Sequence, residues 1–157
     1  MLVGLFWPKW VYIKRFGYAG LFSYVCTTDN DVPGLTNMCF SSADGIFAGK
    51  FRSLTVSFAF ITVVFALISL IWGTISLFTG RKGFFYTAMF HLLATITGYL
   101  ATYWFYSQFS DDNEELRAVI SRHSDVTYDE GYFVYLAGVN FVFLASMASG
   151  LTHFNQE

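Results

Sequence analysis

The chain has 157 residues, of which 55% are hydrophobic and 21% aromatic, whereas only 13% are charged. Soluble domains carry about a quarter charged residues, so the composition argues against an ordinary water-soluble domain. The formal net charge of −2 supplies no basic surface, and we therefore do not expect the chain to bind nucleic acid.

The first part of the chain combines a short apolar segment with two candidate strands. Met1–Trp7 (MLVGLFW) is far shorter than the roughly 20 residues of a membrane-spanning helix. It is also too short for a signal-peptide core with a charged front. Trp10–Ile13 and Gly20–Val25 are rich in aromatic and β-branched residues, a composition that predicts strands.

The two cysteines, Cys26 and Cys39, are thirteen residues apart and flank Val32–Gly34, where Pro33-Gly34 can turn the chain. A disulfide closing this loop would stabilise the fold by about 3 kcal/mol, and it would persist on the oxidising side of a membrane. A zinc site and a nucleophilic cysteine are weaker alternatives. No histidine pair matches the cysteines, and the three histidines lie in other segments: His91, His123 and His153.

Three later segments are long and apolar enough to cross a bilayer: Leu54–Phe78, Phe84–Phe109 and Tyr132–Phe154. In lipid every backbone amide needs a partner within its own segment, so we expect helices. The turn between the first two spans, residues 79–83, is flanked by glycines, and it predicts an antiparallel helix hairpin.

Residues 110–131, between the second and third spans, carry seven carboxylates against two arginines. Leu116, Val119 and Ile120 would give a short helix one apolar face. A solvated cap is the simpler interpretation of this acidic loop. The alternative is a surface that attracts cations or a basic partner. The carboxylates lack the spacing and the glycine of a calcium loop, so we expect no metal site.

Small residues recur at three- and four-residue spacing in the first two spans, which lets neighbouring helices approach closely. On the first span they are Thr55, Ala59, Thr62, Ala66, Ser69, Gly73 and Ser76. On the second span they are Ala88, Thr95, Gly98 and Thr102, and His91 falls on the same stripe. This pattern predicts a left-handed bundle with small crossing angles.

Two polar residues of the spans, His91 and Asn140, are candidates for a function. His91 is expected to be a neutral imidazole hydrogen-bonded to a facing helix, and a ligand-binding or proton-relay function is the alternative. Asn140 is interpreted in the same way, as an interhelical hydrogen bond first and as a binding site second.

Short motifs in a fixed order resemble the claudin superfamily, which also includes peripheral myelin proteins, epithelial membrane proteins and calcium-channel gamma subunits. They are a Pro-x-Trp element, a Gly-Leu-aromatic element, two cysteines and an arginine at the mouth of a span. Here these residues are Pro8 and Trp10, Gly20, Leu21 and Phe22, Cys26 and Cys39, and Arg52. The second and third spans resemble the third and fourth helices of epithelial membrane proteins.

The resemblance implies one claudin-like membrane domain over residues 1–157. It would be a mostly α-helical bundle of four transmembrane helices, three of them present here, with a small disulfide-closed extracellular antiparallel sheet. Residues 1–7 would then be the end of a first helix whose beginning is absent. Residues 8–52 would form the extracellular sheet loop, and residues 110–131 an extracellular acidic loop.

Orientation is the one point on which two arguments conflict. Counting Lys and Arg alone would place the cysteine segment in the cytoplasm. The disulfide argument and the resemblance both place it outside the cell, and we follow them. The C-terminus is then cytoplasmic, and the membrane is the plasma membrane.

We find no pattern that predicts an enzyme, a cofactor or a small-molecule substrate. The spans also lack the interruptions and midplane charges of a transporter. Two functions remain. The first is a claudin-like protein acting through contacts with itself or with other membrane proteins, in cell junctions, adhesion or membrane organisation. The second is an auxiliary subunit of an ion channel or receptor.

Overall fold

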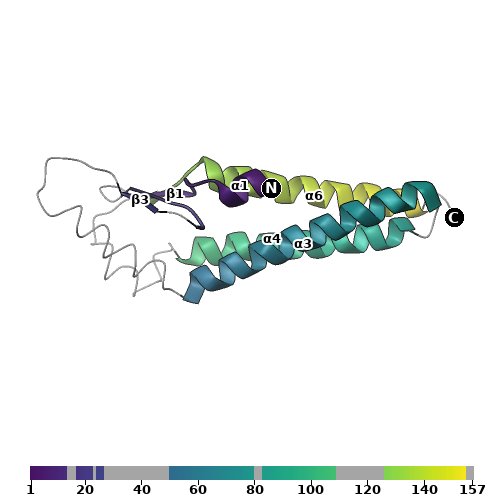
Figure 1. The fold of residues 1–157 in the computed structure, drawn as a ribbon, viewed down its shortest axis with the longest axis horizontal. Helices are drawn as coiled ribbons and strands as arrows, with labels where there is room; N and C mark the ends of the chain where they lie inside the picture. Colours follow the sequence, from purple (N-terminus) through teal and green to yellow (C-terminus); the bar gives the residue numbers. More distant parts are fainter. Residues whose placement is uncertain (14–16, 23, 27–49, 80–82, 109–125, 155–157) are drawn as a thin grey trace, which may run out of the picture.

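The computed structural model describes residues 1–13, 17–22, 24–26, 50–79, 83–108 and 126–154, and the structural statements below concern these residues. They form three long helices, one short helix and a small sheet (Figure 1). In chain order the elements are α1 (Leu2–Phe6), β1 (Val11–Ile13), β2 (Gly17–Ala19), β3 (Tyr24–Cys26), α3 (Lys50–Thr79), α4 (Gly83–Gln108), β4 (Val126–Tyr128) and α6 (Glu130–Phe154).

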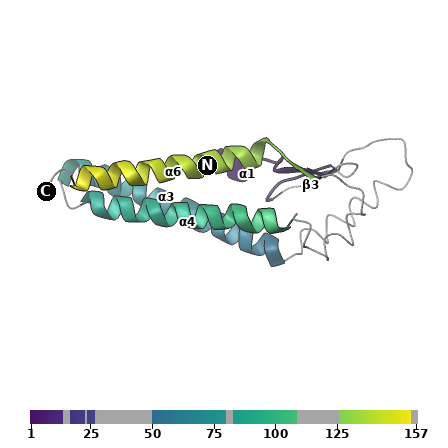
Figure 2. The same ribbon diagram turned by 180° about the vertical axis from the view of Figure 1, so that it is seen from behind.

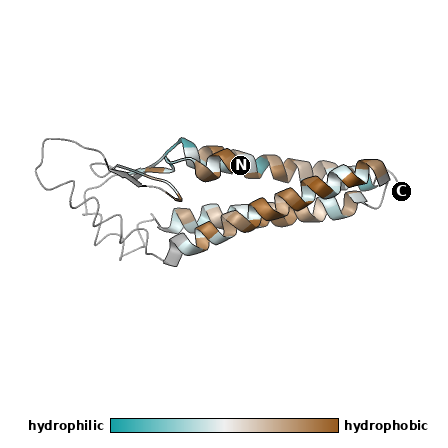
Figure 3. Ribbon diagram, viewed as in Figure 1, coloured by the Kyte–Doolittle hydropathy of each residue, from teal (hydrophilic) through white to brown (hydrophobic). Residues whose placement is uncertain are grey.

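The three long helices supply three candidate membrane spans. By length and composition these spans are Ser53–Phe78, Gly83–Ser107 and Glu130–Phe154. Each agrees with its predicted span to within two residues at either end. Their outward faces carry large apolar side chains, among them Phe78 at 86% exposure and Phe141 at 72%, and Figure 3 shows apolar residues along the bundle. Such faces suit lipid rather than water, and they indicate a membrane protein.

α4 lies between α3 and α6 (Figures 1 and 2), and hydroxyl groups join it to α3. The hydroxyls of Thr62 and Thr97 share a hydrogen bond of 2.9 Å. Ser69 donates to the backbone carbonyl of Thr87 at 3.2 Å. Between two helices in lipid such bonds contribute about 0.6 kcal/mol each, because the separated helices find other partners for the same groups.

Gly98 marks the closest approach between α4 and α6. A Cβ atom built on Gly98 would lie 2.7 Å from Cγ2 of Val139 on α6, and 3.3 Å from Cγ2 of Thr62 on α3. Further along the same interface, Ser146 of α6 donates to the carbonyl of Ala88 at 3.0 Å. All three long helices therefore meet at Gly98, where no larger side chain fits without movement.

The small residues of α3 and α4 lie mostly at these interfaces. On α3, the buried ones are Thr55, Ala59, Thr62, Ser69 and Ser76, and the half-buried ones are Ala66 and Gly73. On α4, the buried ones are Thr95, Gly98 and Thr102, and Ala88 is half-buried, as is His91 on the same stripe.

Beyond one end of the bundle lies a four-stranded antiparallel sheet with strand order β3-β2-β1-β4 (Figure 1). In β1, one of the two inner strands, Tyr12 lies opposite Tyr18 of β2 and opposite Thr127 of β4. The sequence placed the whole sheet within residues 8–52, and that prediction was too narrow. Its outer strand β4 comes from the 110–131 segment, so both connecting segments contribute to one sheet.

The predicted single strand Gly20–Val25 is also corrected. β2 ends before Gly20, the chain bends, and β3 begins at Tyr24. A Cβ atom on Gly20 would lie 2.9 Å from the carbonyl oxygens of both Trp7 and Pro8. This close backbone contact fixes the bend, and it interrupts a composition that favours strand.

The short helix α1 packs against the half of α6 nearest the sheet. A Cβ atom on Gly4 would lie 2.6 Å from the backbone nitrogen of Tyr135, and one on Gly138 would lie 2.7 Å from the nitrogen of Met1. Gly138 is about 12 Å along α6 from Glu130, at 1.5 Å per residue. Met1–Trp7 therefore runs beside α6 from this depth up to the level of the sheet.

Several predictions fall on parts of the chain that lie outside the described residues. They are the bond between Cys26 and Cys39 and the short helix expected near Leu116, and the side chain of the motif residue Arg52 also lies outside the described part. The backbone of Cys26 ends β3, and the backbone of Arg52 lies in the first turn of α3.

The close contact at Gly98 predicts a difference between two glycines that undergo the same change. Gly98→Ala should lower the free energy of unfolding by about 1–3 kcal/mol, the usual cost of an overpacked interface. Gly150→Ala is the matched control, since nothing lies within 4 Å of its built Cβ; it should be neutral or slightly stabilising. Denaturant titration in detergent micelles measures both. Equal unfolding free energies for the two variants would contradict the described packing.

Candidate functional site

The sheet joins the helices at Trp10, whose side chain is fully buried. Its indole Nε1 donates to the backbone carbonyl of Gly4 in α1 at 2.7 Å. Its backbone N–H donates to the carbonyl of Ala19 at 2.9 Å, and its carbonyl accepts from the backbone N–H of Asp129 at 2.9 Å. One residue thus holds α1, the sheet and the beginning of α6 in fixed positions.

Aromatic rings from two of the long helices surround the Trp10 indole. Phe105 of α4 meets it edge-on with ring centroids 4.9 Å apart. On α6, Tyr135 lies 5.1 Å away and Tyr132 6.0 Å away. Ring pairs at such separations add about 0.5–1.5 kcal/mol each beyond the area that they bury. The indole therefore fastens the sheet to α4 as well as to α6.

Gly131 allows the sheet to approach α6 this closely. Its backbone N–H donates to the carbonyl of Lys9 at 2.8 Å. A Cβ atom at this position would lie 2.6 Å from the same oxygen and 2.8 Å from Cδ1 of Trp10. A residue other than glycine would force the two segments apart.

The residues that carry the claudin-like motifs lie together around this junction. Pro8 and Gly20 are in backbone contact, and the side chain of Leu21 is buried. Phe22 stacks on Phe6 at 5.5 Å and meets Phe60 of α3 edge-on at 5.8 Å. The first half of the motif therefore connects α1, the sheet and α3. Arg52 lies in the first turn of α3.

His91 and Asn140, the two candidates that the sequence offered within the spans, lie away from this junction. Asn140 of α6 accepts a hydrogen bond from the hydroxyl of Tyr99 on α4. His91 is half-buried, and its Nδ1 has no hydrogen-bond partner in the part of the chain that the structure describes. The sequence predicted a hydrogen bond from His91 to a facing helix, and no such bond is found for Nδ1.

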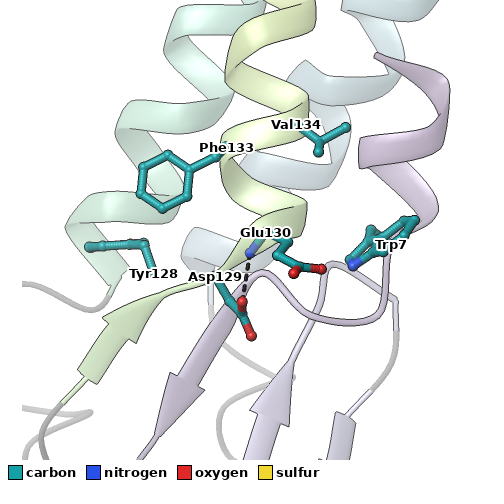
Figure 4. Close-up of a pocket in the computed structure, with 6 residues that line it drawn as sticks. All are labelled: Trp7, Tyr128, Asp129, Glu130, Phe133 and Val134. Carbon is teal, nitrogen blue, oxygen red and sulfur yellow. Dashed lines mark hydrogen bonds between the residues drawn. The ribbon is translucent and has the colours of Figure 1, made fainter.

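Beside the junction, a hollow of about 510 Å³ opens at the surface where α6 begins. We call it the aromatic hollow, and Figure 4 shows the six residues that line it. They are Trp7, Tyr128, Asp129, Glu130, Phe133 and Val134. Asp129 directly precedes α6, and its Oδ1 accepts the backbone N–H of Glu130 at 2.7 Å.

Tyr128 forms part of this lining as a neutral phenol. Burial raises the pKa of Tyr128 above its ordinary value, and the neighbouring phenols of Tyr132 and Tyr106 raise it further. The rings of Tyr128 and Tyr106 are stacked with centroids 5.6 Å apart. Tyr128 therefore keeps its proton at neutral pH, and the fixed negative charges of the hollow come from Asp129 and Glu130.

Sequence reasoning did not identify the aromatic hollow. It assigned Trp7 to the end of a helix and assigned Asp129 and Glu130 to a solvated acidic loop. The available signal was Tyr-Asp-Glu-Gly immediately before an apolar span. Its meaning depends on the pairing of β4 with β1, which brings Trp7 beside it.

Comparisons of the chain with models of protein families, with curated proteins and with solved structures give no match. The resemblance to claudins thus stands on the short motifs named above. Among the described residues, no group of three or more His, Cys, Asp and Glu side chains could hold a metal ion.

The burial of Trp10 predicts that it contributes far more to stability than a tryptophan at the lipid surface. Trp10→Ala should cost about 3–5 kcal/mol of unfolding free energy, as expected for a large buried ring. Trp72→Ala is the control, because Trp72 is 40% exposed on α3. Trp10→Phe keeps a ring but loses the N–H donor to Gly4, and it should fall between the two. Denaturant titration in micelles gives all three values, and the account is wrong if Trp72→Ala costs as much as Trp10→Ala.

Proposed function

We propose that this chain is a claudin-like integral protein of the plasma membrane that acts through contacts with other membrane proteins or with further copies of itself. The observation that supports this proposal is the gathering of Pro8, Trp10, Gly20, Leu21 and Phe22 at the joint between sheet and helices. These residues belong to one short stretch, residues 8–22, and together they build one interface between the sheet and the helices.

In this proposal the sheet is a platform held at a fixed height above the membrane. The hydrogen bonds and ring contacts of Trp10 restrict tilting of the sheet against the bundle. A rigid platform lowers the entropy cost of association, because little remains to be ordered when a partner binds. The face with Tyr12 and Tyr18, whose rings lie 5.0 Å apart, offers aromatic side chains of the kind enriched in interfaces.

The cysteine segment then lies outside the cell, where a bond between Cys26 and Cys39 would persist, and the C-terminus lies in the cytoplasm. The contacts would serve cell junctions, adhesion or membrane organisation.

A second function, that of an auxiliary subunit of a channel or receptor, is favoured by the surface of α6. Within an apolar 18-residue stretch of each span, 11% of the α6 residues are buried, against 28% for α3 and for α4. Phe141 and Phe154, exposed at 72% and 71%, lie on this surface. A helix of a larger membrane protein could pack there within the plane of the bilayer.

One experiment with two matched variants separates these functions. The tagged chain is expressed in two cell populations, and its enrichment where they touch is measured, together with the membrane proteins that co-purify after cross-linking. We expect enrichment that Tyr12→Ser on the sheet abolishes and that Phe141→Ala on α6 leaves intact. A co-purifying channel or receptor that is lost in Phe141→Ala supports the second function. A monomer with neither enrichment nor a co-purifying membrane protein contradicts both.

A further inference from the structure

We propose that the aromatic hollow binds the quaternary ammonium group of a choline lipid, whose acyl chains lie along Phe133 and Val134. This inference depends on α6 lying in a membrane, and it does not depend on the claudin-like function.

The rings of the hollow suit a cation that has no hydrogen to donate. Trp7, Tyr128 and Phe133 each contribute an aromatic ring, and Figure 4 shows Tyr128 and Phe133 on one side of Glu130 with Trp7 on the other. The faces of such rings attract quaternary ammonium groups through their electron density. Because Tyr128 remains a neutral phenol, it would attract the cation through its aromatic ring and not through a phenolate charge.

The charges of the hollow are of the sign that the cation requires. Asp129 and Glu130 each bring a carboxylate, and none of the six lining residues is basic. Among the described residues neither carboxylate has an ion-pair partner; the backbone N–H of Glu130 occupies one oxygen of Asp129. The nearby Lys9 ammonium lies over the Tyr18 ring, 4.6 Å from its centroid, and does not line the hollow.

The position of the hollow favours a lipid over a soluble cation or a basic peptide. Glu130 is the first residue of the α6 span, so it lies at headgroup level. Phe133 and Val134 lie about 5–6 Å deeper along the helix, and they are 56% and 40% exposed. The lining thus changes from charged to apolar in the direction in which a phospholipid changes from headgroup to acyl chain. Two carbons separate the lipid's nitrogen from its phosphate, so the phosphate can stay outside the rings.

The test uses the full chain, purified in a mild detergent and titrated with phospholipids that share the same acyl chains. Native mass spectrometry measures the retained lipid for phosphatidylcholine, phosphatidylethanolamine and phosphatidylglycerol. We expect phosphatidylcholine to be retained several-fold more strongly than either of the others. Phe133→Leu, which keeps apolar volume but removes the ring, and Glu130→Gln should each reduce that preference by about threefold to tenfold. Phe141→Leu, the same change at another exposed position on α6, should leave it unchanged.

Four outcomes would overturn the proposal. Equal retention of phosphatidylethanolamine would show that methylation of the nitrogen is not recognised. Preferred retention of phosphatidylglycerol, an anionic lipid, would show that the hollow does not prefer a cationic group. Displacement of the lipid by soluble phosphocholine at equal concentration would show that the acyl chains make no contact. Displacement by an oligolysine peptide would assign the hollow to a basic protein partner.

Discussion

The position of Trp10 between a membrane bundle and a sheet outside it constrains nearly every other contact at this end of the molecule. Its indole must be buried, and its N–H must find an acceptor, which Gly4 supplies at 2.7 Å. Satisfying both conditions brings α1 beside α6. The backbone of the same residue is bonded on one side to β2 and on the other to Asp129, which directly precedes α6. The sheet therefore cannot move independently of the helices.

The helices themselves are held by a different kind of interaction. Lipid tails are as apolar as leucine, so burial of large side chains gives little force between helices in a membrane. The chain uses close approach instead, with Gly98 against Val139 and the hydroxyl pair of Thr62 and Thr97. Large apolar side chains are consequently left on the outside, facing lipid or a partner protein.

The helices pack through closely spaced residues, whereas the sheet depends on contacts between distant segments. This difference explains how much of the structure the sequence could predict. The three spans follow from length and hydropathy, and the small residues of α3, such as Thr62 and Ser69, show their spacing within one segment. The pairing of β1 with β4 could not be predicted, because three residues of an acidic segment join a strand more than a hundred residues away. The aromatic hollow was missed for the same reason, since Trp7 and Tyr128 meet only through that pairing. Local pattern predicts helices in lipid well, whereas long-range strand pairing leaves no periodic signal in so short a strand.

The account makes Trp10 and Lys9 the backbone link between sheet and bundle, and amide hydrogen exchange of the unmodified protein in lipid nanodiscs tests that link most directly. The backbone N–H groups of Asp129 and Gly131 lie at the membrane surface, where water can reach a loop. Because they donate to the carbonyls of Trp10 and Lys9 at 2.9 and 2.8 Å, they should exchange as slowly as the amides of β1. Exchange at the rate of an unstructured peptide would mean that the sheet is not fastened to α6, and the account would be wrong.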